Sequence, residues 1–318
     1  MIWFWQFREK QRYSLNELYR AIEISKQGVH SLLDNFQRKM EMEATLVNLI
    51  HEIRKDHPTM ALRSMYHKIK PEGIGRDRFE AICVLYGFKT YHPRNYKRTT
   101  YSDGVKRFPN LLSNLKITAV NQVWVSDITY FEVEDQFYYI TFVMDAYSRF
   151  IKGYHVSQSL RTVATTIPAL RMAIKKYKPP KDLIFHSDGG GQYYSKRFLK
   201  LTAAHSIKNS MAKEAYQNPQ AERINGTIKN GYLRHWNINN YKTLVKLVDR
   251  AVALYNYEKP HKSLKYLMPK NMEENQYICN GQPVEGDESR TAILATIGAS
   301  SPSVAGQPVS GSDVHPAI

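Results

Sequence analysis

Three acidic residues lie in sequence contexts that suit chemistry on phosphodiesters. Asp127 occupies the middle of Val123–Phe131, whose period of two predicts a half-buried strand. Asp188 lies just past a short apolar run and precedes three glycines, and Glu222 lies in a stretch with helical periodicity. Because burial of an unpaired charge is costly, Asp127 should be paired, protonated or bound to a metal.

The residue types favour a hard divalent cation. Mg²⁺ and Mn²⁺ prefer oxygen ligands, and such a site needs neither thiolates nor a histidine cluster. Two ions about 4 Å apart can activate a water or a 3′-hydroxyl for attack on a phosphodiester and stabilise the leaving oxygen. Three dispersed carboxylates therefore fit metal-dependent cleavage or strand transfer on nucleic acid.

Three other residues compete for the same role. Asp145 ends an expected strand and could be a ligand, although the Ser-Arg pair that follows it favours a role in a turn with a salt bridge. Glu214 is the main rival of Glu222, but it lies in loop sequence without helical periodicity. His186 could bind a metal, orient the neighbouring aspartate or pack beneath the loop.

The elements that position these carboxylates are typical of a compact α/β arrangement. Periodicity predicts a meander of three antiparallel strands over 123–131, 137–144 and 150–156. A helix should follow over 163–177, in which Pro168 implies a kink or a later start. A short buried strand is expected over 183–185, and a mobile polar loop over 209–217. Active sites of such sheets lie at the carboxyl ends of strands, where Asp188 is found.

A further helix is expected to open at Asn218-Pro219, because proline suits the first turn. Its buried stripe would consist of residues that recur every four positions, namely Ile224, Ile228, Tyr232 and Trp236. Glu222, Asn225 and Lys229 fall together on another, open face. We therefore expect Asn225 and Lys229 to contact DNA beside the third carboxylate, although Lys229 could also be ordinary surface charge.

Composition narrows the class of partner. The 318 residues contain 45 Lys and Arg against 29 Asp and Glu, and the net charge of +16 predicts attraction to nucleic acid or an anionic membrane. No apolar run reaches the roughly 18 residues that span a bilayer, and the amino terminus lacks the pattern of a signal peptide. Two cysteines are too few for a disulfide framework or a cysteine-based zinc site. These features favour a cytosolic protein that handles DNA or RNA, with no membrane partner.

Two helical units are expected before the sheet, over 1–39 and 40–88. In the first, Ser14 and Glu17 form a capping-box pattern and Ser25 can cap a second helix with apolar residues at 29, 32, 33 and 36. A helix-turn-helix would place Lys26 and Gln27 near base edges, and a plain helical hairpin fits the spacing equally well. The second unit contains three short helices, and Arg76 and Arg78 stand at the head of the last, where DNA contacts are expected.

The next segment, 89–119, is a basic linker with interleaved tyrosines. Arg94, Lys97 and Arg98 could follow a phosphate backbone while the rings stack on bases, or the segment could be an ordinary solvated linker. The catalytic region should extend over 120–275. The remaining 276–318 is acidic and rich in Gly, Ser, Pro and Ala, so we expect it to be mostly disordered. An acidic arm that competes with DNA for the basic body is the alternative.

Five motifs in order resemble the integrase core of DDE transposases, and more narrowly the IS-three family of bacterial insertion sequences, whose core is similar to that of retroviral integrases. The likeness covers roughly residues 40–272, and any one motif alone would be weak. The motifs are Trp124-x-Ser-Asp-Ile-Thr-Tyr130, Asp145-x-x-Ser-Arg149, His186-Ser-Asp-Gly-Gly-x-Gln-Tyr193, Asn218-Pro-x-Ala-Glu222 and Tyr255-Asn-x-x-x-Pro-His-x-Ser-Leu264.

The resemblance implies an RNase H-like catalytic core, α/β in class, preceded by all-α helix-turn-helix DNA-binding units. It implies that Asp127, Asp188 and Glu222 are catalytic and bind metal, with two Mg²⁺ or Mn²⁺ ions per site. The reaction would join 3′ ends of element DNA to a target, often through a circular intermediate. The family loop before the glutamate often reads Gly-Asn-x-x-Asp-Asn-Ala, whereas residues 215–221 read Ala-Tyr-Gln-Asn-Pro-Gln-Ala, a departure that concerns loop contacts.

The implied partners are double-stranded DNA, as element terminal repeats and as target, and further copies of the chain in an oligomer. Many family members also fuse to a protein from an upstream frame. Whether this chain has such a partner from the same element is left open by the sequence. The expected location is the bacterial cytoplasm, at the nucleoid. Two other functions compete, a DNA-binding regulator without catalysis and a structure-specific nuclease of the same fold. The intact carboxylate triad speaks against the first, and the helical units against the second.

Overall fold

The computed structural model describes residues 9, 14–90, 107–212 and 218–279. Arg94, Lys97 and Arg98 of the basic linker, Glu214 and the expected disordered tail from residue 280 on lie outside the described residues. The elements described up to Gln276 belong to one compact unit. None of the helices in the described part is both long and apolar enough to cross a membrane.

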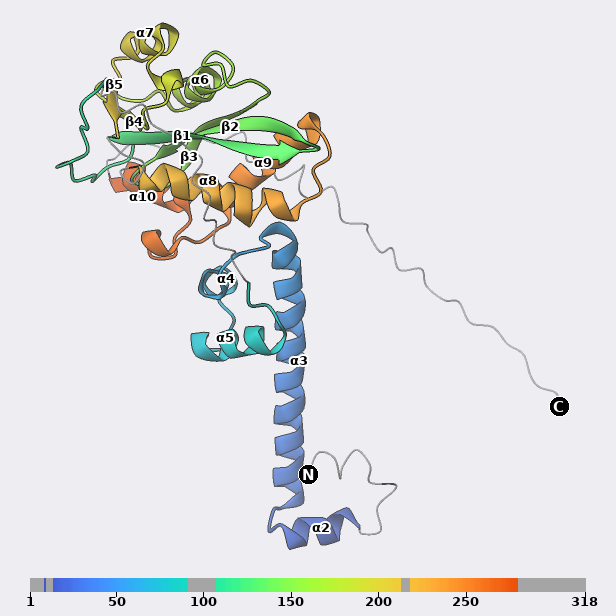
Figure 1. Cartoon of the computed structure of the whole chain (residues 1–318). Helices are drawn as coiled ribbons and strands as arrows, with labels where there is room; N and C mark the ends of the chain where they lie inside the picture. Colours follow the sequence, from blue (N-terminus) through green and yellow to red (C-terminus); the bar gives the residue numbers. More distant parts are fainter. Residues whose placement is uncertain (1–8, 10–13, 91–106, 213–217, 280–318) are drawn as a thin grey trace, which may run out of the picture. The chain divides into compact units, whose positions relative to one another are not determined.

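A five-stranded mixed sheet forms the centre of the catalytic region (Figure 1). Strands β1 (Val123–Val133), β2 (Gln136–Asp145) and β3 (Ile151–Ser157) form the expected antiparallel meander. Strands β4 (Ile184–Ser187) and β5 (Lys208–Met211) run parallel to β1, in the order β3-β2-β1-β4-β5. This α/β arrangement confirms the RNase H-like core that the resemblance implied.

One part of this sheet was not expected. Residues 209–211 were predicted to belong to a loop, and together with Lys208 they form β5 instead. Their polar composition hides the strand, because the pairing of β5 with β4 rests on backbone hydrogen bonds. Ser210 and Met211 are nevertheless buried, since the strand lies between β4 and the chain around Pro109 and Leu111.

Helices cover both faces of the sheet, and each face has its own apolar core. Helices α6 (Thr166–Tyr177) and α7 (Lys196–Ala204) lie on one face, and α8 (Pro219–Gly231) and α9 (Tyr241–Tyr257) lie on the other (Figure 1). In β1, Trp124 belongs to the first core, whereas Val123 and Val125 belong to the second, as the alternation of side chains requires.

One helix boundary confirms the prediction and one differs from it. Helix α6 begins at Thr166, which is the later start that Pro168 implied, so the proline lies in the first turn and no kink is needed. Helix α8 ends at Gly231, so Trp236 is not part of its buried stripe, and a short 3₁₀ turn over Leu233–His235 follows. Tyr232, the residue after the helix, is still buried.

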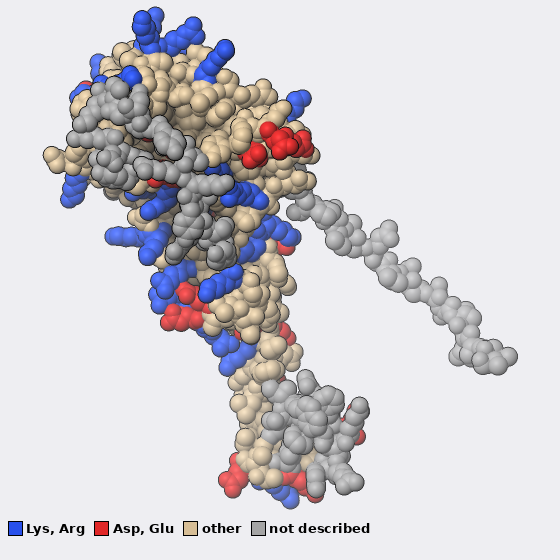
Figure 2. All heavy atoms as spheres, in the orientation of Figure 1, with Lys and Arg blue, Asp and Glu red and all other residues tan. Residues whose placement is uncertain are grey.

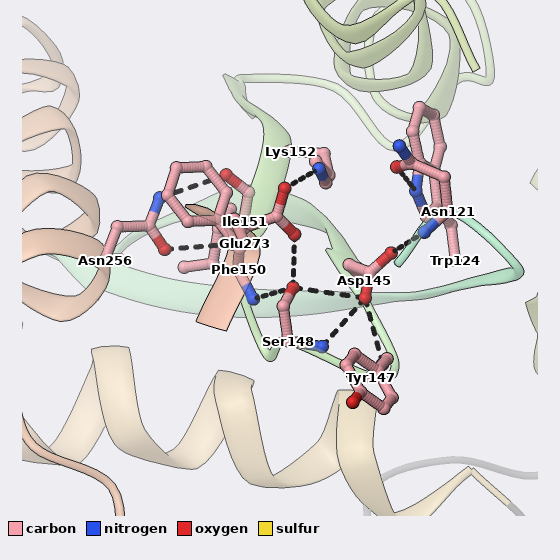
Figure 3. Close-up of polar contacts among 10 residues, drawn as sticks. All are labelled: Asn121, Trp124, Asp145, Tyr147, Ser148, Phe150, Ile151, Lys152, Asn256 and Glu273. Atoms are coloured by element: carbon pink, nitrogen blue, oxygen red, sulfur yellow. Dashed lines mark hydrogen bonds and ion pairs between the residues drawn. The ribbon is translucent and has the colours of Figure 1, made fainter. Parts of the chain in front are cut away.

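Helix α10 (Pro269–Cys279) is attached to the sheet by a buried polar network (Figure 3). Glu273 of this helix forms an ion pair with Lys152 of β3, and both side chains are almost completely buried. The Ser148 hydroxyl contacts the Glu273 carboxylate and lies 3.1 Å from Oδ1 of Asp145. Because each polar group has a partner, the network can be buried at a tolerable cost in free energy.

The amino-terminal part is helical, as expected, but its division differs from the prediction. Helix α2 (Leu15–Ala21) follows the capping box of Ser14 and Glu17, and Ser25 caps α3 (Lys26–Asp56). Helix α3 runs without a break across the expected boundary at residue 39/40. The segment 37–45 contains strong helix formers and neither glycine nor proline, so nothing there ends the helix.

The expected second helical unit is present and includes the end of α3. Helices α4 (Leu62–Ile69) and α5 (Arg76–Leu85) pack against α3 around a small core that contains Ile50, Met65 and Phe79. This helical unit contacts the catalytic region through the pairs His57–Tyr232, with 3.0 Å between Nδ1 and the hydroxyl, and Lys68–Glu258, with 2.8 Å between Nζ and the carboxylate.

Candidate active site

The parallel pairing of β1 with β4 brings two aspartates together. Ser126 pairs with Ser187 at the end of the shared register, and the next residues on the two strands are Asp127 and Asp188. Strand β4 ends there, whereas β1 continues to Val133. The two carboxylates therefore lie where one edge of β1 loses its neighbouring strand.

The environment of Asp127 disfavours its charged form. Its Oδ1 accepts a hydrogen bond from the backbone N–H of Ile128 at 2.8 Å, and its Oδ2 accepts one from Nδ2 of Asn225 at 2.8 Å. Burial, and after it the negative charge of Asp188, outweigh these bonds and raise the pKa of Asp127 to about 7; the Glu222 carboxylate adds to the rise. Near neutral pH this aspartate is poised between its two forms.

Asp188 is held by the turn that follows it. The N–H of Gly190 donates to Oδ1 of Asp188 at 3.1 Å, which lowers the pKa, but burial dominates and raises it above the ordinary value. A Cβ atom at Gly190 would lie 3.0 Å from the same Oδ1. Glycine at this position therefore allows the backbone to approach the carboxylate.

Glu222 lies in the first turn of α8 and is exposed. Its negative charge adds to the raised pKa of Asp127, as expected for a carboxylate on the helix that packs against β1. Among the described residues, no three His, Cys, Asp or Glu side chains are close enough together to hold a metal ion as they stand. The structure thus brings Asp127 and Asp188 together, and Glu222 stands at the margin of this pair.

The structure corrects the expectation that Asn225 and Lys229 lie on an open face of α8. Asn225 is only 7% exposed, and its amide donates to Asp127. Lys229 is half-buried, with Nζ 3.4 Å from the carbonyl oxygen of Tyr130 and 4.8 Å from the centre of the tyrosine ring. Burial lowers the pKa of Lys229. The part of this face around Asn225 is covered because α8 packs against β1, whereas Glu222 at its start stays exposed.

Asn218 is a site residue that the sequence interpretation missed. It was read only as the residue that opens α8. Its Nδ2 donates to the carbonyl oxygen of Ser126 at 3.0 Å, and the side chain is buried. The start of α8 is thereby attached to the residue before Asp127. The Asn-Pro pair was the available signal, since a capping-type residue followed by proline marks a helix start that needs a fixed position.

Two residues that competed for the role of metal ligand, Asp145 and His186, make contacts typical of structural residues. Asp145 is fully buried, and its Oδ1 accepts from the backbone N–H groups of Tyr147 and Ser148 while Oδ2 accepts from the N–H of Asn121 (Figure 3). This supports the expected turn role. His186 is also fully buried, with Nδ1 2.9 Å from the hydroxyl of Ser210, its partner on the neighbouring strand β5, so its contacts are those of a structural residue of the sheet.

The candidate DNA contacts of the helical region are at exposed positions. Lys26 and Gln27 lie in the first turn of α3. Arg76 and Arg78 lie in the first turn of α5, where Arg76 pairs with the adjacent Asp77 and Arg78 Nη2 lies 3.6 Å from Glu43. None of these four residues is in contact with Asp127 or Asp188 in the described hydrogen bonds or ion pairs.

The donor set at the site fits a hard divalent cation. Asp127, Asp188 and Glu222 offer carboxylate oxygens only, the ligands that Mg²⁺ and Mn²⁺ prefer. The pKa values of both aspartates are raised, and for Asp127 part of the cause is the repulsion between carboxylates. A bound cation would relieve that repulsion and stabilise the ionised forms.

Two models of the integrase core domain match this chain, one over residues 117–216 and the other over residues 204–269. The 31 kDa protein of insertion element IS600 from Shigella sonnei is 30% identical over 226 residues, which are 69% of this chain and 83% of that protein. The putative transposase InsK of insertion sequence element IS150 from Escherichia coli K12 is 25% identical over 280 residues, 85% and 96% of the two chains.

Among solved structures, the catalytic core domain of the HTLV-2 integrase in complex with magnesium is similar to this chain. The sequence identity is 21% and the TM-score is 0.41, and the match covers 48% of this chain and 96% of that domain.

Proposed function

Because this chain belongs to the integrase-core transposases of the IS-three family of bacterial insertion elements, a group of DDE polynucleotidyl transferases, we propose that it cleaves and joins DNA. In this proposal the chain binds the terminal repeats of its element as double-stranded DNA and transfers their 3′ ends to a target. The observation that carries the proposal is the pair of half-buried aspartates, Asp127 and Asp188, beside the helix that bears Glu222.

Each residue of the site has its own role in this proposal. Asp127, Asp188 and Glu222 would hold two Mg²⁺ or Mn²⁺ ions, which activate the attacking oxygen and stabilise the leaving oxygen. Asn225 holds the Asp127 carboxylate in place through the bond to Oδ2. Lys229 binds a phosphate of the element end, since its ammonium group lies on the same helix two turns beyond Glu222.

The charge of the surface supports a DNA substrate. Figure 2 shows Lys and Arg side chains spread over the catalytic region and the helical unit, with fewer acids on the same face. Lys26, Gln27, Arg76 and Arg78 are proposed to contact DNA from the first turns of α3 and α5. Arg94, Lys97 and Arg98 of the linker would add phosphate contacts along the same duplex.

The proposed assembly is an oligomer of this chain on two paired element ends, active at the nucleoid. A protein from an upstream frame of the same element is the second proposed partner. Both proposals rest on the family, and the assay below separates the chain acting alone from the chain that needs the second partner.

The test is a strand-transfer assay. Purified chain is incubated with a labelled terminal-repeat duplex and a target plasmid in Mg²⁺ or Mn²⁺, beside Asp188→Asn and a control, Asp135→Asn, at the exposed tip of the β1–β2 hairpin. We expect metal-dependent joined products that Asp188→Asn abolishes and Asp135→Asn retains. Tight binding without nicks or joints, also after addition of the upstream-frame protein, would contradict catalysis and favour a regulator. Nicks without joints would favour a nuclease.

A further inference from the structure

The middle of α3 carries an apolar face that no described element covers. The helix has 31 residues, about 46 Å at 1.5 Å per residue. Val29 near its start is buried, and Ile50 near its end packs in the helical core with α4 and α5. Between them Leu32, Phe36 and Met40 are 55%, 43% and 48% exposed.

The spacing on this face is that of a coiled coil. Val29, Leu33, Phe36 and Met40 follow one another at intervals of four, three and four residues, which defines the seam of a heptad pattern. The next seam positions are Lys26 before this group and Glu43 after it. Leu33 in this seam is half-buried, and Phe36 and Met40 are exposed. An apolar seam that is accessible over about two turns is typical of a helix that packs against a partner helix.

The charges at the two ends of the seam indicate which partner helix fits it and in which direction that helix runs. If two copies of α3 paired in parallel, Lys26 would face Lys26 and Glu43 would face Glu43, and both layers would repel. If they paired antiparallel about a point between residues 34 and 35, Lys26 of each copy would face Glu43 of the other. The central layers would then be Leu33 with Phe36, and Met40 of each copy would face the apolar surroundings of Val29 of the other, where Val29 itself is fully buried.

We propose that α3 pairs antiparallel with α3 of a second copy of this chain, through a two-fold seam from Lys26 to Glu43. Because Val29 is already buried, Met40 of the second copy would contact the junction of α2 and α3, where Ile22 is 39% exposed. Arg78, with Nη2 3.6 Å from Glu43, would share that carboxylate with Lys26 of the second copy. The pairing supplies a surface for the oligomer of the proposed function, but needs neither DNA nor metal.

The first experiment measures self-association of the full chain by sedimentation, without DNA or divalent metal. We expect a dimer at roughly 50 µM, and Phe36→Lys should weaken it about 100-fold because a charge replaces a central apolar layer. The matched control is Thr45→Lys, on the opposite, exposed side of the same helix, which should change the dissociation constant less than about threefold. Circular dichroism checks that both variants keep their helices. A monomer at this concentration, or equal effects of the two variants, would overturn the seam.

The second experiment tests direction by charge exchange. Lys26→Glu or Glu43→Lys alone should weaken the dimer about tenfold, because each creates two repulsive layers, and the double exchange should restore it to within about threefold. In a parallel pair, Lys26→Glu would only replace one like-charge layer by another, so no loss and no rescue would occur. Failure of this pattern would overturn the antiparallel pairing while leaving the strand-transfer result untouched, because the two assays share no component other than the chain.

Discussion

Asp127 combines the interactions that give the site its chemistry. It lies on a strand that is covered by α8, and a second carboxylate stands on the neighbouring strand. Burial and repulsion raise its pKa to about 7, well above the ordinary value of an aspartate. The folded protein therefore holds a proton on Asp127 at pH values at which the unfolded chain has released it.

This pKa leads to a prediction about stability. Between about pH 4 and pH 7 the native state binds more protons at Asp127 than the unfolded state, so this group lowers the free energy of unfolding as the pH rises, and the loss is complete above pH 7. Asp127→Asn should therefore raise the free energy of unfolding at pH 8 by about 1–3 kcal/mol, and by much less at pH 4.5. Denaturant titrations without divalent metal measure both values.

Asp135→Asn serves as the control for this prediction, because that residue is exposed and lies in a turn at positive φ, where asparagine is tolerated. It should change stability by less than about 0.5 kcal/mol at either pH. A destabilised Asp127→Asn, or the same gain at pH 4.5 and pH 8, would contradict the raised pKa.

Asn225 is a positioning residue for Asp127. Its amide donates to Oδ2 and thereby lowers the pKa of the carboxyl, so Asn225→Ala should raise that pKa further and weaken metal binding. We expect Mn²⁺ affinity to fall about tenfold at pH 8 and more at pH 6.5, where protonation competes better. Calorimetric titration with Mn²⁺ at the two pH values tests this. Thr227→Ala, on the other side of α8, is the control, and an equal loss at both pH values would argue for a merely structural role.

At the scale of elements, β3 and α6 approach more closely than any side chain at residue 153 would allow. A Cβ atom on Gly153 would lie 2.3 Å from the carbonyl oxygen of Ala169 and 2.9 Å from the backbone nitrogen of Ala173. Both obstacles are helix backbone, which cannot move without displacing α6. The close approach of helix and sheet therefore depends on this glycine.

We predict that Gly153→Ala lowers the free energy of unfolding by about 3 kcal/mol or more, as expected for overpacking against backbone. Gly226→Ala is the matched control in α8, because a Cβ atom there meets nothing within 4 Å. That change should be neutral or should stabilise the helix by up to about 1 kcal/mol. Thermal and denaturant unfolding of the two variants provide the measurement, and similar losses in both would contradict the close approach.

Helix α10 gives a second prediction at this scale. Glu273 neutralises Lys152 in the interior, and its removal would leave a buried ammonium group without its ion-pair partner (Figure 3). Glu273→Ala should therefore cost about 3–5 kcal/mol of unfolding free energy. The double variant Lys152→Met/Glu273→Leu should recover most of the loss, because an apolar pair of similar size needs no charge compensation.

Glu274→Ala, in the same helix and paired only with Lys270 at 3.4 Å, should cost less than about 1 kcal/mol. Denaturant titrations of the four proteins compare these values. If Glu273→Ala and Glu274→Ala lost the same stability, the buried pair would not be what attaches α10 to β3.

At the scale of the whole molecule, charge governs the interaction with DNA. A net charge of +16 on 318 residues predicts an affinity for any duplex that falls steeply with salt, since bound phosphates release counterions. The helical unit is attached to the catalytic region by Asp56–Arg250 as well as by the His57 and Lys68 contacts. A duplex held by one region can therefore be positioned relative to the other.

Lys229→Ala should weaken binding to element ends more than binding to random duplex, and should reduce the slope of log K against log salt concentration by about 1. Fluorescence anisotropy with the two duplexes over a range of salt concentrations measures both effects. Lys55→Ala removes the same charge from an exposed lysine that is paired with Glu52, and should affect both duplexes alike. Equal losses on the two duplexes for Lys229→Ala would reduce it to a nonspecific phosphate contact.

Local sequence patterns predicted much of this protein. The meander of three strands, the capping of α2 and α3 by Ser14 and Ser25, and the position of Asp188 after a buried strand all follow from periodicity and capping chemistry, which involve neighbours in the chain. The division of the helical region failed for a local reason as well, since a stretch of good helix formers joined two predicted helices into α3.

Contacts between distant residues could not be read in this way. The bond from Asn225 to Asp127, the pairing of β5 with β4 and the ion pair of Lys152 with Glu273 each join segments that no periodic pattern connects. These three contacts depend on how the helices and strands pack in the tertiary structure. Once α8 covered the face of β1 beyond the end of β4, an asparagine predicted to meet DNA became a buried donor to a carboxylate, because a buried charge gains more from a hydrogen-bond donor than an exposed amide gains from water.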